Sequence, residues 1–265
     1  MSRLVDRYDL VILDLDGVVV LGDRPVAGAP EALIRLRESG KTICFVTNNA
    51  SRRASKVAGI LAGMGIEASE HEVLTSAGAA AAMLGRKLEA EAKVLVVGAP
   101  ALAEEVAAHG LQVVDTAEAN PAAVVQGYGP DVGWRHLAEA CVAIRAGALW
   151  VATNADRTLP TPRGALPGNG ALVAALATAL DRPPDTVVGK PEPELFLAAA
   201  REAGAKRSLV VGDRLDTDIA GARRAGMDSL LVLTGVADER ALSRVPPDER
   251  PTYVAPDLSG LWDVA

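Results

Sequence analysis

The chain has 265 residues, a formal net charge of −7 and a hydrophobic fraction of 49%. This length allows one large or two modest domains, and the acidic balance argues against a nucleic-acid-binding surface, which needs clustered basic residues. No apolar run is long enough for a membrane-spanning helix, and the first residues do not resemble a signal peptide. We therefore expect a soluble, cytoplasmic protein whose core is built from Ala, Val and Leu, because aromatic residues make up only 3%.

The first predicted strand is the apolar run 10–13, which ends at Asp14-Leu15-Asp16-Gly17. Open α/β sheets bind their ligands at the carboxyl ends of their strands. Side chains at i and i+2 of a strand point to the same side, so the two aspartates would bring their charges together and need a cation or a shared proton. A simple turn is the alternative interpretation, because Asp-x-Asp-Gly also occurs in ordinary turns.

The second predicted strand, residues 42–46, ends in Thr47-Asn48-Asn49 and follows a predicted helix at 30–39. We expect Ser51 to cap the next helix, which reaches about Gly63. This leaves Thr47 as a candidate ligand-binding residue at the same sheet edge as Asp14. The alternative is that Thr47 itself caps the helix.

The middle of the chain predicts a second α/β unit that begins near residue 76. The segment 154–169 is rich in Pro and Gly and is predicted to be a long functional loop, with an exposed connection as the alternative. Strands are predicted at 93–97, 123–126 and 149–153, and helices at 79–88, 100–109, 134–145 and 169–180.

After Asp181-Arg182-Pro183-Pro184, which is typical of a hinge, the first pattern returns. A short strand at 186–188 leads to Lys190, and a strand at 208–211 leads to Asp213, with Asp218 five residues later. Each of these residues has an ordinary interpretation as a solvated lysine, a helix cap or a first-turn acid. Helices at 192–203 and 218–225 and a strand at 229–233 complete this part.

Together the four strand ends predict phosphoryl-transfer chemistry. A carboxylate can attack phosphorus, and a hydroxyl and an ammonium can hold phosphate oxygens. Further carboxylates supply the hard oxygen ligands that magnesium prefers. The cysteines and histidines are not expected to take part: Cys44 lies in an apolar strand and is expected to be a reduced core thiol, and the three histidines lack ligand spacing.

This ordered set of motifs resembles the haloacid dehalogenase superfamily over essentially the whole chain. The first motif, D-x-D-G-[TV], begins at Asp14; the second is Thr47, the third is Lys190, and the fourth, G-D-x-x-x-x-D, contains Asp213 and Asp218. Asn48 and Asn49 are typical of the branch that includes nitrophenyl phosphatases, pyridoxal phosphate phosphatase and NagD proteins.

The resemblance implies an α/β fold: a doubly wound, Rossmann-like parallel-sheet core with an inserted α/β cap. The core would comprise residues 1–77 and 184–265, and the cap would comprise residues 78–183. Caps of this branch form dimers in some members, so a homodimer is one expectation.

The resemblance also implies a magnesium-dependent phosphatase that forms an aspartyl phosphate. Asp14 would be the nucleophile and Asp16 the general acid and base. Thr47, the backbone amide of Asn48 and Lys190 would hold the phosphate. The Mg²⁺ ion would be held by Asp14, by the backbone carbonyl of Asp16, by Asp213 and, through water, by Asp218.

Within the branch, the segments 166–170 and 212–218 are similar to the actinobacterial glycerol 3-phosphate phosphatases, which implies glycerol 3-phosphate as the first candidate among small phosphorylated metabolites. The alternatives are a broad-specificity phosphatase or one acting on phosphoglycolate, pyridoxal phosphate, a nucleoside monophosphate or 4-nitrophenyl phosphate, and a non-catalytic phosphometabolite-binding protein. An oxidoreductase is disfavoured because no G-x-G-x-x-G follows the first strand. The resemblance also implies that the loop beginning at residue 154 meets the part of the substrate beyond the phosphate, through Asn154, Asp156, Arg157, Thr158 and Leu159.

Overall fold

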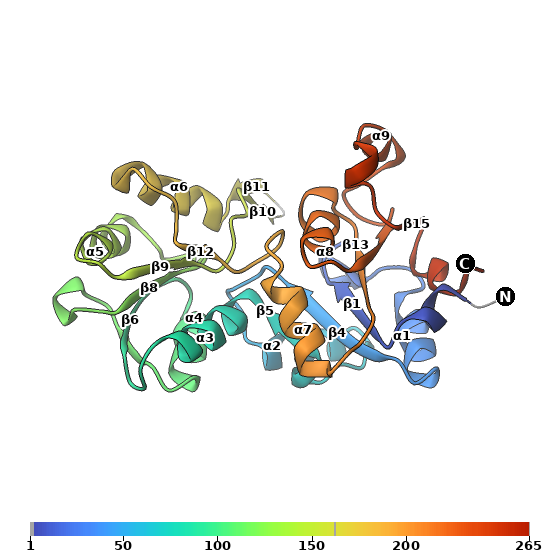
Figure 1. The fold of residues 1–265 in the computed structure, drawn as a ribbon, viewed down its shortest axis with the longest axis horizontal. Coiled ribbons are helices and arrows are strands. Elements are labelled where there is room, and N and C mark those ends of the chain that lie inside the picture. Colours follow the sequence, from blue (N-terminus) through green and yellow to red (C-terminus); the bar gives the residue numbers. More distant parts are fainter. Residues whose placement is uncertain (1–2, 162, 265) are drawn as a thin grey trace. The chain divides into compact units, whose positions relative to one another are not determined.

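The computed structural model describes residues 3–161 and 163–264, which form two compact units (Figure 1). The first unit comprises Met1–Thr47, Ala54–Leu74 and Lys190–Ala265, and the second comprises Asn48–Arg53 and Thr75–Gly189. The sequence placed the boundaries at 77/78 and 183/184, whereas the chain crosses between the units after Leu74 and after Gly189. The segment Asn48–Arg53 also groups with the second unit, which no local pattern indicated.

The first unit is built on a six-stranded sheet with the order β15-β14-β13-β1-β4-β5. Strand β1 lies inside this sheet and pairs in parallel with β13 and β4, so Leu10 faces Ser208 on one side and Thr42 on the other. All five residues of β1 are buried, as its continuous apolar run predicts. The strands span Leu10–Asp14 (β1), Thr42–Thr47 (β4), Val73–Thr75 (β5), Ser208–Gly212 (β13), Asp228–Val232 (β14) and Tyr253–Ala255 (β15).

Helices cover both faces of this sheet. Val11 and Leu13 belong to a hydrophobic cluster with Leu33 and Leu36 of helix α1. Leu10 and Ile12 point to the opposite face, into a cluster with Phe196 of α7 and Ala222 of α8. This alternation confirms the predicted doubly wound architecture. The helices of this unit span Ala29–Glu38 (α1), Ala54–Gly63 (α2), Glu194–Ala203 (α7), Ala220–Arg224 (α8) and Glu239–Ser243 (α9).

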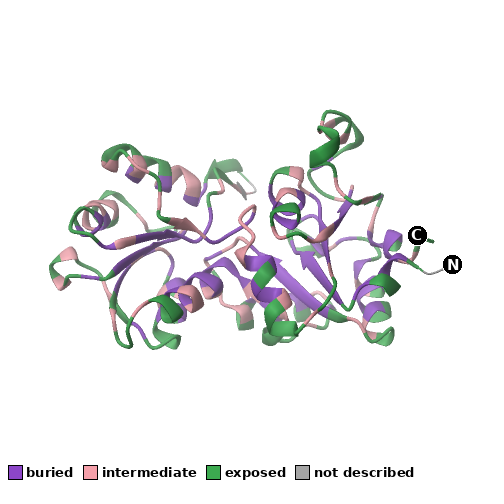
Figure 2. Cartoon of the chain, in the orientation of Figure 1, coloured by how far each residue is buried: buried purple, intermediate pink, exposed green. Residues whose placement is uncertain are grey.

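The second unit contains a separate five-stranded sheet with the order β12-β9-β8-β6-β7, and every neighbouring pair is parallel. Small side chains build much of its packing: Ala77, Ala79, Ala80 and Ala81 of α3 are all buried. Figure 2 shows the buried strands within each unit and the exposed outer faces of the helices. The strands span Lys93–Val97 (β6), Gln112–Val114 (β7), Ala123–Gln126 (β8), Leu149–Ala152 (β9) and Thr186–Val187 (β12), and the helices span Ser76–Lys87 (α3), Pro100–Ala108 (α4), Trp134–Arg145 (α5) and Asn169–Leu180 (α6).

Three local predictions were wrong. Helix α2 begins at Ala54, and the Ser51 hydroxyl donates to the Asn49 side chain instead of capping the helix. The predicted strand at 186–188 was assigned to the first unit, but β12 pairs with β9 of the second. The segment predicted as a long loop forms an antiparallel hairpin of β10 (Thr158–Thr161) and β11 (Gly164–Pro167), and its Pro162 lies outside the described residues.

No helix among the described residues has the length and apolar character needed to cross a membrane.

The remaining short elements lie before, between or after the longer strands and helices. The short elements are the strands β2 (Val20–Leu21) and β3 (Arg24–Pro25), the 3₁₀ turns Leu4–Arg7, Glu70–Glu72, Ala117–Ala119, Pro247–Glu249 and Leu258–Trp262, and a π-helical turn at Leu215–Ile219.

A bidentate ion pair ties α1 to the turn before β5, and its removal should destabilise the first unit. Arg37 donates from Nη1 to Glu72 Oε1 at 2.5 Å and from Nη2 to Glu72 Oε2 at 2.9 Å. Its Nη2 also donates to the Glu67 carbonyl at 2.9 Å. We expect Glu72→Gln to lower the free energy of unfolding by about 1–2 kcal/mol at neutral pH, because charge-assisted hydrogen bonds in a partly buried site are lost. Urea denaturation followed by circular dichroism measures the difference.

The stability difference between the wild type and Glu72→Gln should decrease at low pH. Burial raises the pKa of Glu72, but the hydrogen bonds from Arg37 and Ser69 outweigh burial and leave the pKa below its ordinary value. The ion pair therefore stabilises the folded state above the ordinary pKa of Glu, and this stabilisation is lost as pH falls through the lowered pKa. Glu194→Gln, which breaks the more exposed pair with Arg201, is the control and should change stability by less than about 0.5 kcal/mol. An equal effect of both substitutions would contradict the argument.

Candidate active site

Asp14 is the last residue of β1 and is only 7% exposed. Asp16 lies beyond the strand end, is exposed, and forms an isolated bridge with Val20. The expectation that both aspartates share one side of a continuing strand was wrong, because the strand ends at Asp14. The two carboxylates therefore have different surroundings, one buried among other charged groups and one accessible to water.

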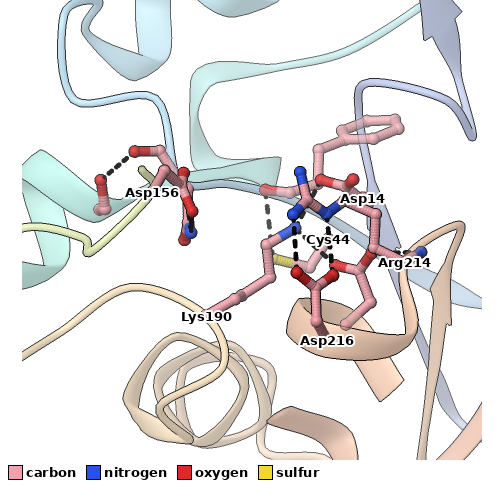
Figure 3. Close-up of polar contacts among 10 residues, drawn as sticks. Asp14, Cys44, Asp156, Lys190, Arg214 and Asp216 are labelled. Atoms are coloured by element: carbon pink, nitrogen blue, oxygen red, sulfur yellow. Dashed lines mark hydrogen bonds and ion pairs between the residues drawn. The ribbon is translucent and has the colours of Figure 1, made fainter. Parts of the chain in front are cut away.

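Lys190 is the buried partner of Asp14. Its Nζ donates to Oδ1 of Asp14 at 2.6 Å and to Oδ1 of Asp218 at 2.7 Å. The lysine side chain is 4% exposed, and Figure 3 shows it extending toward Asp14. Residues so far apart in the sequence thus form one buried ionic cluster.

The strand alternation of β1 explains how Lys190 reaches Asp14. Asp14 lies on the same face of the strand as Leu10 and Ile12, because side chains alternate between the two faces. The side chains of Leu10 and Ile12 pack against α7. Lys190 begins the segment that leads into α7. Lys190 was predicted to follow a strand of the first sheet, but the strand before it, β12, belongs to the second sheet.

Asp213 follows the last residue of β13 and is 1% exposed. Its Oδ2 accepts a hydrogen bond from the backbone N–H of Val236 at 2.7 Å. Glycine is required at positions 17 and 235, because a Cβ added at either position would overlap the Asp213 carboxylate. Sequence reasoning missed Gly235 and Val236, although they follow β14 and so lie near the same carboxyl edge of the sheet.

Asp218 is fully buried within the π-helical turn Leu215–Ile219. Its Oδ2 accepts from the backbone N–H of Arg214 at 3.1 Å, in addition to the contact with Lys190. The Arg214 side chain points to Asp216, with Nη2 2.8 Å from Oδ2 (Figure 3). π-Helical turns often occur at functional sites, and here the turn directs Asp218 inward while Asp216 is exposed.

The electrostatics of the cluster follow from burial and charge. Burial raises the pKa of Asp14 to about 8, with Lys190 acting in the opposite direction and Asp218 adding to the rise. Burial lowers the pKa of Lys190, but the carboxylates of Asp14 and Asp218 raise it above its ordinary value. Burial also raises the pKa of Asp213 to about 6, although the hydrogen bond from Val236 opposes this. Additional positive charge would therefore favour the ionised carboxylates.

The acidic residues fit a magnesium ion. Asp14, Asp213 and Asp218 are buried and each offers a carboxylate oxygen, with all three oxygens within 4.8 Å of one another. Oδ1 of Asp213 is buried and has no hydrogen-bond partner among the described residues. A buried, unpaired carboxylate oxygen is costly, and a hard cation satisfies it.

The other predicted residues are distributed over both units. Thr47 is the last residue of β4 and is 4% exposed. Asn48 belongs to the second unit, where its side-chain Nδ2 donates to both oxygens of Asp156 at 3.1 and 3.2 Å. Asn154 is buried and contacts the backbone of Asn48. The side chains of Arg157 and Thr158 are exposed, and Leu159 lies in strand β10.

Cys44 is a buried free thiol in β4, as predicted. Burial raises its pKa to about 12, so the reactive thiolate is strongly disfavoured. This agrees with a structural role for Cys44.

Comparison with known proteins relates the chain to haloacid dehalogenase-like hydrolases. Residues 11–112 match the family model described as haloacid dehalogenase-like hydrolase, and residues 187–261 match an HAD-hydrolase-like model. A D-glycerol 3-phosphate phosphatase of Mycobacterium tuberculosis is 50% identical over 261 residues, which are 98% of this chain and 73% of that protein. Chronophin of Mus musculus is 37% identical over 268 residues, covering 96% of this chain and 91% of the relative.

Solved structures agree with this relationship. A glycerol phosphate phosphatase from Mycobacterium tuberculosis, solved in complex with magnesium, has a TM-score of 0.94 and 50% identity, covering 99% of this chain and 79% of that one. A p-nitrophenyl phosphatase from Archaeoglobus fulgidus has a TM-score of 0.89 and 32% identity, covering 96% and 98%. The chain therefore belongs to the haloacid dehalogenase-like hydrolase family and is a phosphatase of that family.

Proposed function

We propose that the protein is a magnesium-dependent phosphomonoesterase with glycerol 3-phosphate as its first candidate substrate. The observation that carries the chemistry is the buried cluster in which Lys190 Nζ lies 2.6 Å from Asp14 and 2.7 Å from Asp218. The candidate substrate rests on the 50% identity to the D-glycerol 3-phosphate phosphatase. The alternative is another small phosphomonoester, which the more distant relatives with other names support. The cytoplasmic location and the homodimer remain predictions.

In the proposed reaction, Asp14 attacks the phosphorus atom through a carboxylate oxygen. The bond between phosphorus and the substrate's alcohol oxygen breaks, and Asp16 gives a proton to the departing alkoxide. Asp16 then takes a proton from the water that attacks the aspartyl phosphate, which releases inorganic phosphate and restores Asp14. The exposure of Asp16 supports this role, since a group that exchanges protons with water must reach water.

Lys190 supports the nucleophile in two ways. Its positive charge favours the ionised form of the buried Asp14, whose pKa is about 8. It also offers an ammonium group to phosphate oxygens, together with the Thr47 hydroxyl and the Asn48 backbone amide. The magnesium ion would be held by Asp14, the Asp16 carbonyl, Asp213 and, through water, Asp218. Its positive charge would offset the negative charge of the phosphate.

We further propose that the first unit, predicted from the sequence as residues 1–77 and 184–265, is the catalytic core. The second unit, predicted as residues 78–183, would be the cap that selects the substrate. The hairpin of β10 and β11 contains Thr158 and Leu159, which were expected to meet the substrate beyond the phosphate. The exposed side chain of Thr158 is available for such a contact.

The loss of one metal ligand should weaken magnesium binding and raise the magnesium concentration that activity requires. We expect Asp213→Asn to abolish activity at ordinary magnesium concentrations, with at most partial recovery at high magnesium, because an anionic oxygen ligand is lost. A magnesium titration of phosphate release measures this. Asp216→Asn, an identical substitution three residues away at an exposed position, should keep the magnesium dependence of the wild type. Full wild-type activity in the presence of a chelator would overturn the proposal.

Substitutions of the two aspartates of the first motif should block different steps of the reaction. Asp14→Asn removes the nucleophile, so no phosphoenzyme should form. Asp16→Asn leaves the nucleophile but lacks the proton-transfer group, which typically contributes ~10²–10⁴ in rate. Because 4-nitrophenolate needs little protonation to depart, phosphorylated Asp14 should accumulate in Asp16→Asn with 4-nitrophenyl phosphate.

Intact-mass spectrometry after rapid mixing separates these cases. One added phosphoryl group is expected in Asp16→Asn and none in Asp14→Asn. Wild-type turnover by Asp14→Asn would require a different nucleophile.

The hairpin should govern selectivity and not phosphate binding. Replacing residues 158–167 with the equivalent hairpin of a relative should change the ranking of substrates by kcat/KM. Inhibition by inorganic phosphate should remain close to that of the wild type, because the phosphate-holding groups lie elsewhere in the sequence. An unchanged ranking across small phosphomonoesters would assign selectivity to other residues of the second unit.

A further inference from the structure

The backbone carbonyl of Asn48 is held by two side chains from distant parts of the second unit. Ser76 Oγ donates to this oxygen at 2.7 Å, and Asn154 Nδ2 donates to the same oxygen at 2.7 Å. Ser76 is fully buried and Asn154 is 4% exposed, so neither hydrogen bond competes strongly with water. The peptide group that follows Asn48 is therefore fixed from two directions.

The side chain of Asn48 is tied to the same structure. Its Nδ2 donates to Asp156, and the backbone N–H of Asp156 donates to Asn154 Oδ1 at 3.1 Å. The Asn154 amide thus uses its donor for the carbonyl of Asn48 and its acceptor for the residue that binds the Asn48 side chain. Backbone and side chain of Asn48 are both held through Asn154.

Close packing leaves little freedom around this arrangement. A Cβ added at Gly189 would lie 2.6 Å from Asn48 Oδ1 and 2.9 Å from the Asn154 Cβ. Asn169, the first residue of α6, donates from Nδ2 to the Asn154 carbonyl at 2.7 Å and to the Gln126 carbonyl at 3.3 Å. Asn169 is 1% exposed, so Asn154 is itself fixed by a buried amide.

We propose that Asn154 is a positioning residue for phosphate binding, which orients Asn48 by holding its carbonyl and, through Asp156, its side chain. This inference rests on the proposed function, in which the Asn48 backbone amide holds a phosphate oxygen. Holding the carbonyl and the side chain of Asn48 fixes the position of its Cα and so of the backbone nitrogen that carries the N–H. Preorganised donors of this kind stabilise developing negative charge without reorganisation. Asn154 and Asp156 then act through Asn48, instead of meeting the substrate beyond its phosphate.

Asn154→Asp is the sharpest test. The substitution keeps the size of the side chain and the acceptor for the Asp156 N–H, but it places a carboxylate oxygen against the Asn48 carbonyl. We expect the inhibition constant of inorganic phosphate to rise about tenfold and kcat/KM to fall about 10²-fold, because small displacements of a binding group have effects of this size. The decrease should be the same factor for glycerol 3-phosphate and 4-nitrophenyl phosphate, because the two substrates share only the phosphoryl group.

Two further variants separate positioning from stability. Ser76→Ala removes the second hydrogen bond to the same carbonyl and should change the same quantities in the same direction by a smaller factor. Gln126→Glu is the control, because it buries a carboxylate near Trp150 in the second unit and should lower the melting temperature. The Gln126 side chain hydrogen-bonds to Trp150 and not to Asn48, so phosphate inhibition should be unchanged. Matching melting temperatures of Asn154→Asp and Gln126→Glu would make the comparison direct.

The outcomes are distinct. Wild-type phosphate inhibition in Asn154→Asp, or a decrease in kcat/KM for one alcohol and not for the other, would overturn the positioning role. If Asn154→Asp does not fold, Ser76→Ala decides, and an unchanged inhibition constant in that variant overturns the inference. Absence of phosphatase activity in the wild-type protein would instead remove the proposed function.

Discussion

The Lys190 ammonium group, held between the carboxylates of Asp14 and Asp218, is the interaction on which the site depends. Burying an unpaired charge costs several kcal/mol, so each of these groups is tolerated inside the protein only because the others are present. Asp213 adds a third buried carboxylate to the cluster, and one ammonium does not balance three. The remaining negative charge favours a divalent cation, and a chain with a net charge of −7 thereby gains the local positive charge that phosphate binding needs.

The sheet of the first unit brings these groups together. Strand β1 lies between β13 and β4, so Asp14, Asp213 and Thr47 follow or end neighbouring parallel strands. Parallel strands have their carboxyl ends at one edge, which is why these side chains converge there. Glycine at positions 17 and 235 lets the backbone approach the Asp213 carboxylate closely. The rigid sheet and these close approaches hold charged groups that would otherwise repel one another.

The chain passes between the two units next to two of the proposed phosphate-binding residues, Thr47 and Lys190. The chain crosses from one unit to the other between Thr47 and Asn48 and again between Gly189 and Lys190. Asn48 is held by Ser76, Asn154 and Asp156, all of the second unit. Under the proposed role of Asn48, a substitution deep in the second unit alters phosphate binding without contacting the substrate. Effects on selectivity and on phosphate affinity therefore need to be measured separately.

The sequence by itself determined the local elements and the inventory of reactive groups. Strands β6 and β8 and helices α5 and α6 have the predicted bounds, because hydrophobic periodicity and flanking Gly or Pro residues are local signals. Only the tertiary structure decided that β12 joins the second sheet, that residues 158–167 pair as a hairpin, that Asp14 is buried while Asp16 is exposed, and that Val236 and Asn154 support the motif residues. The physical reason is the same in each case: a two-residue strand carries no information about its partner, and burial and hydrogen bonding between distant residues arise only when the whole chain packs.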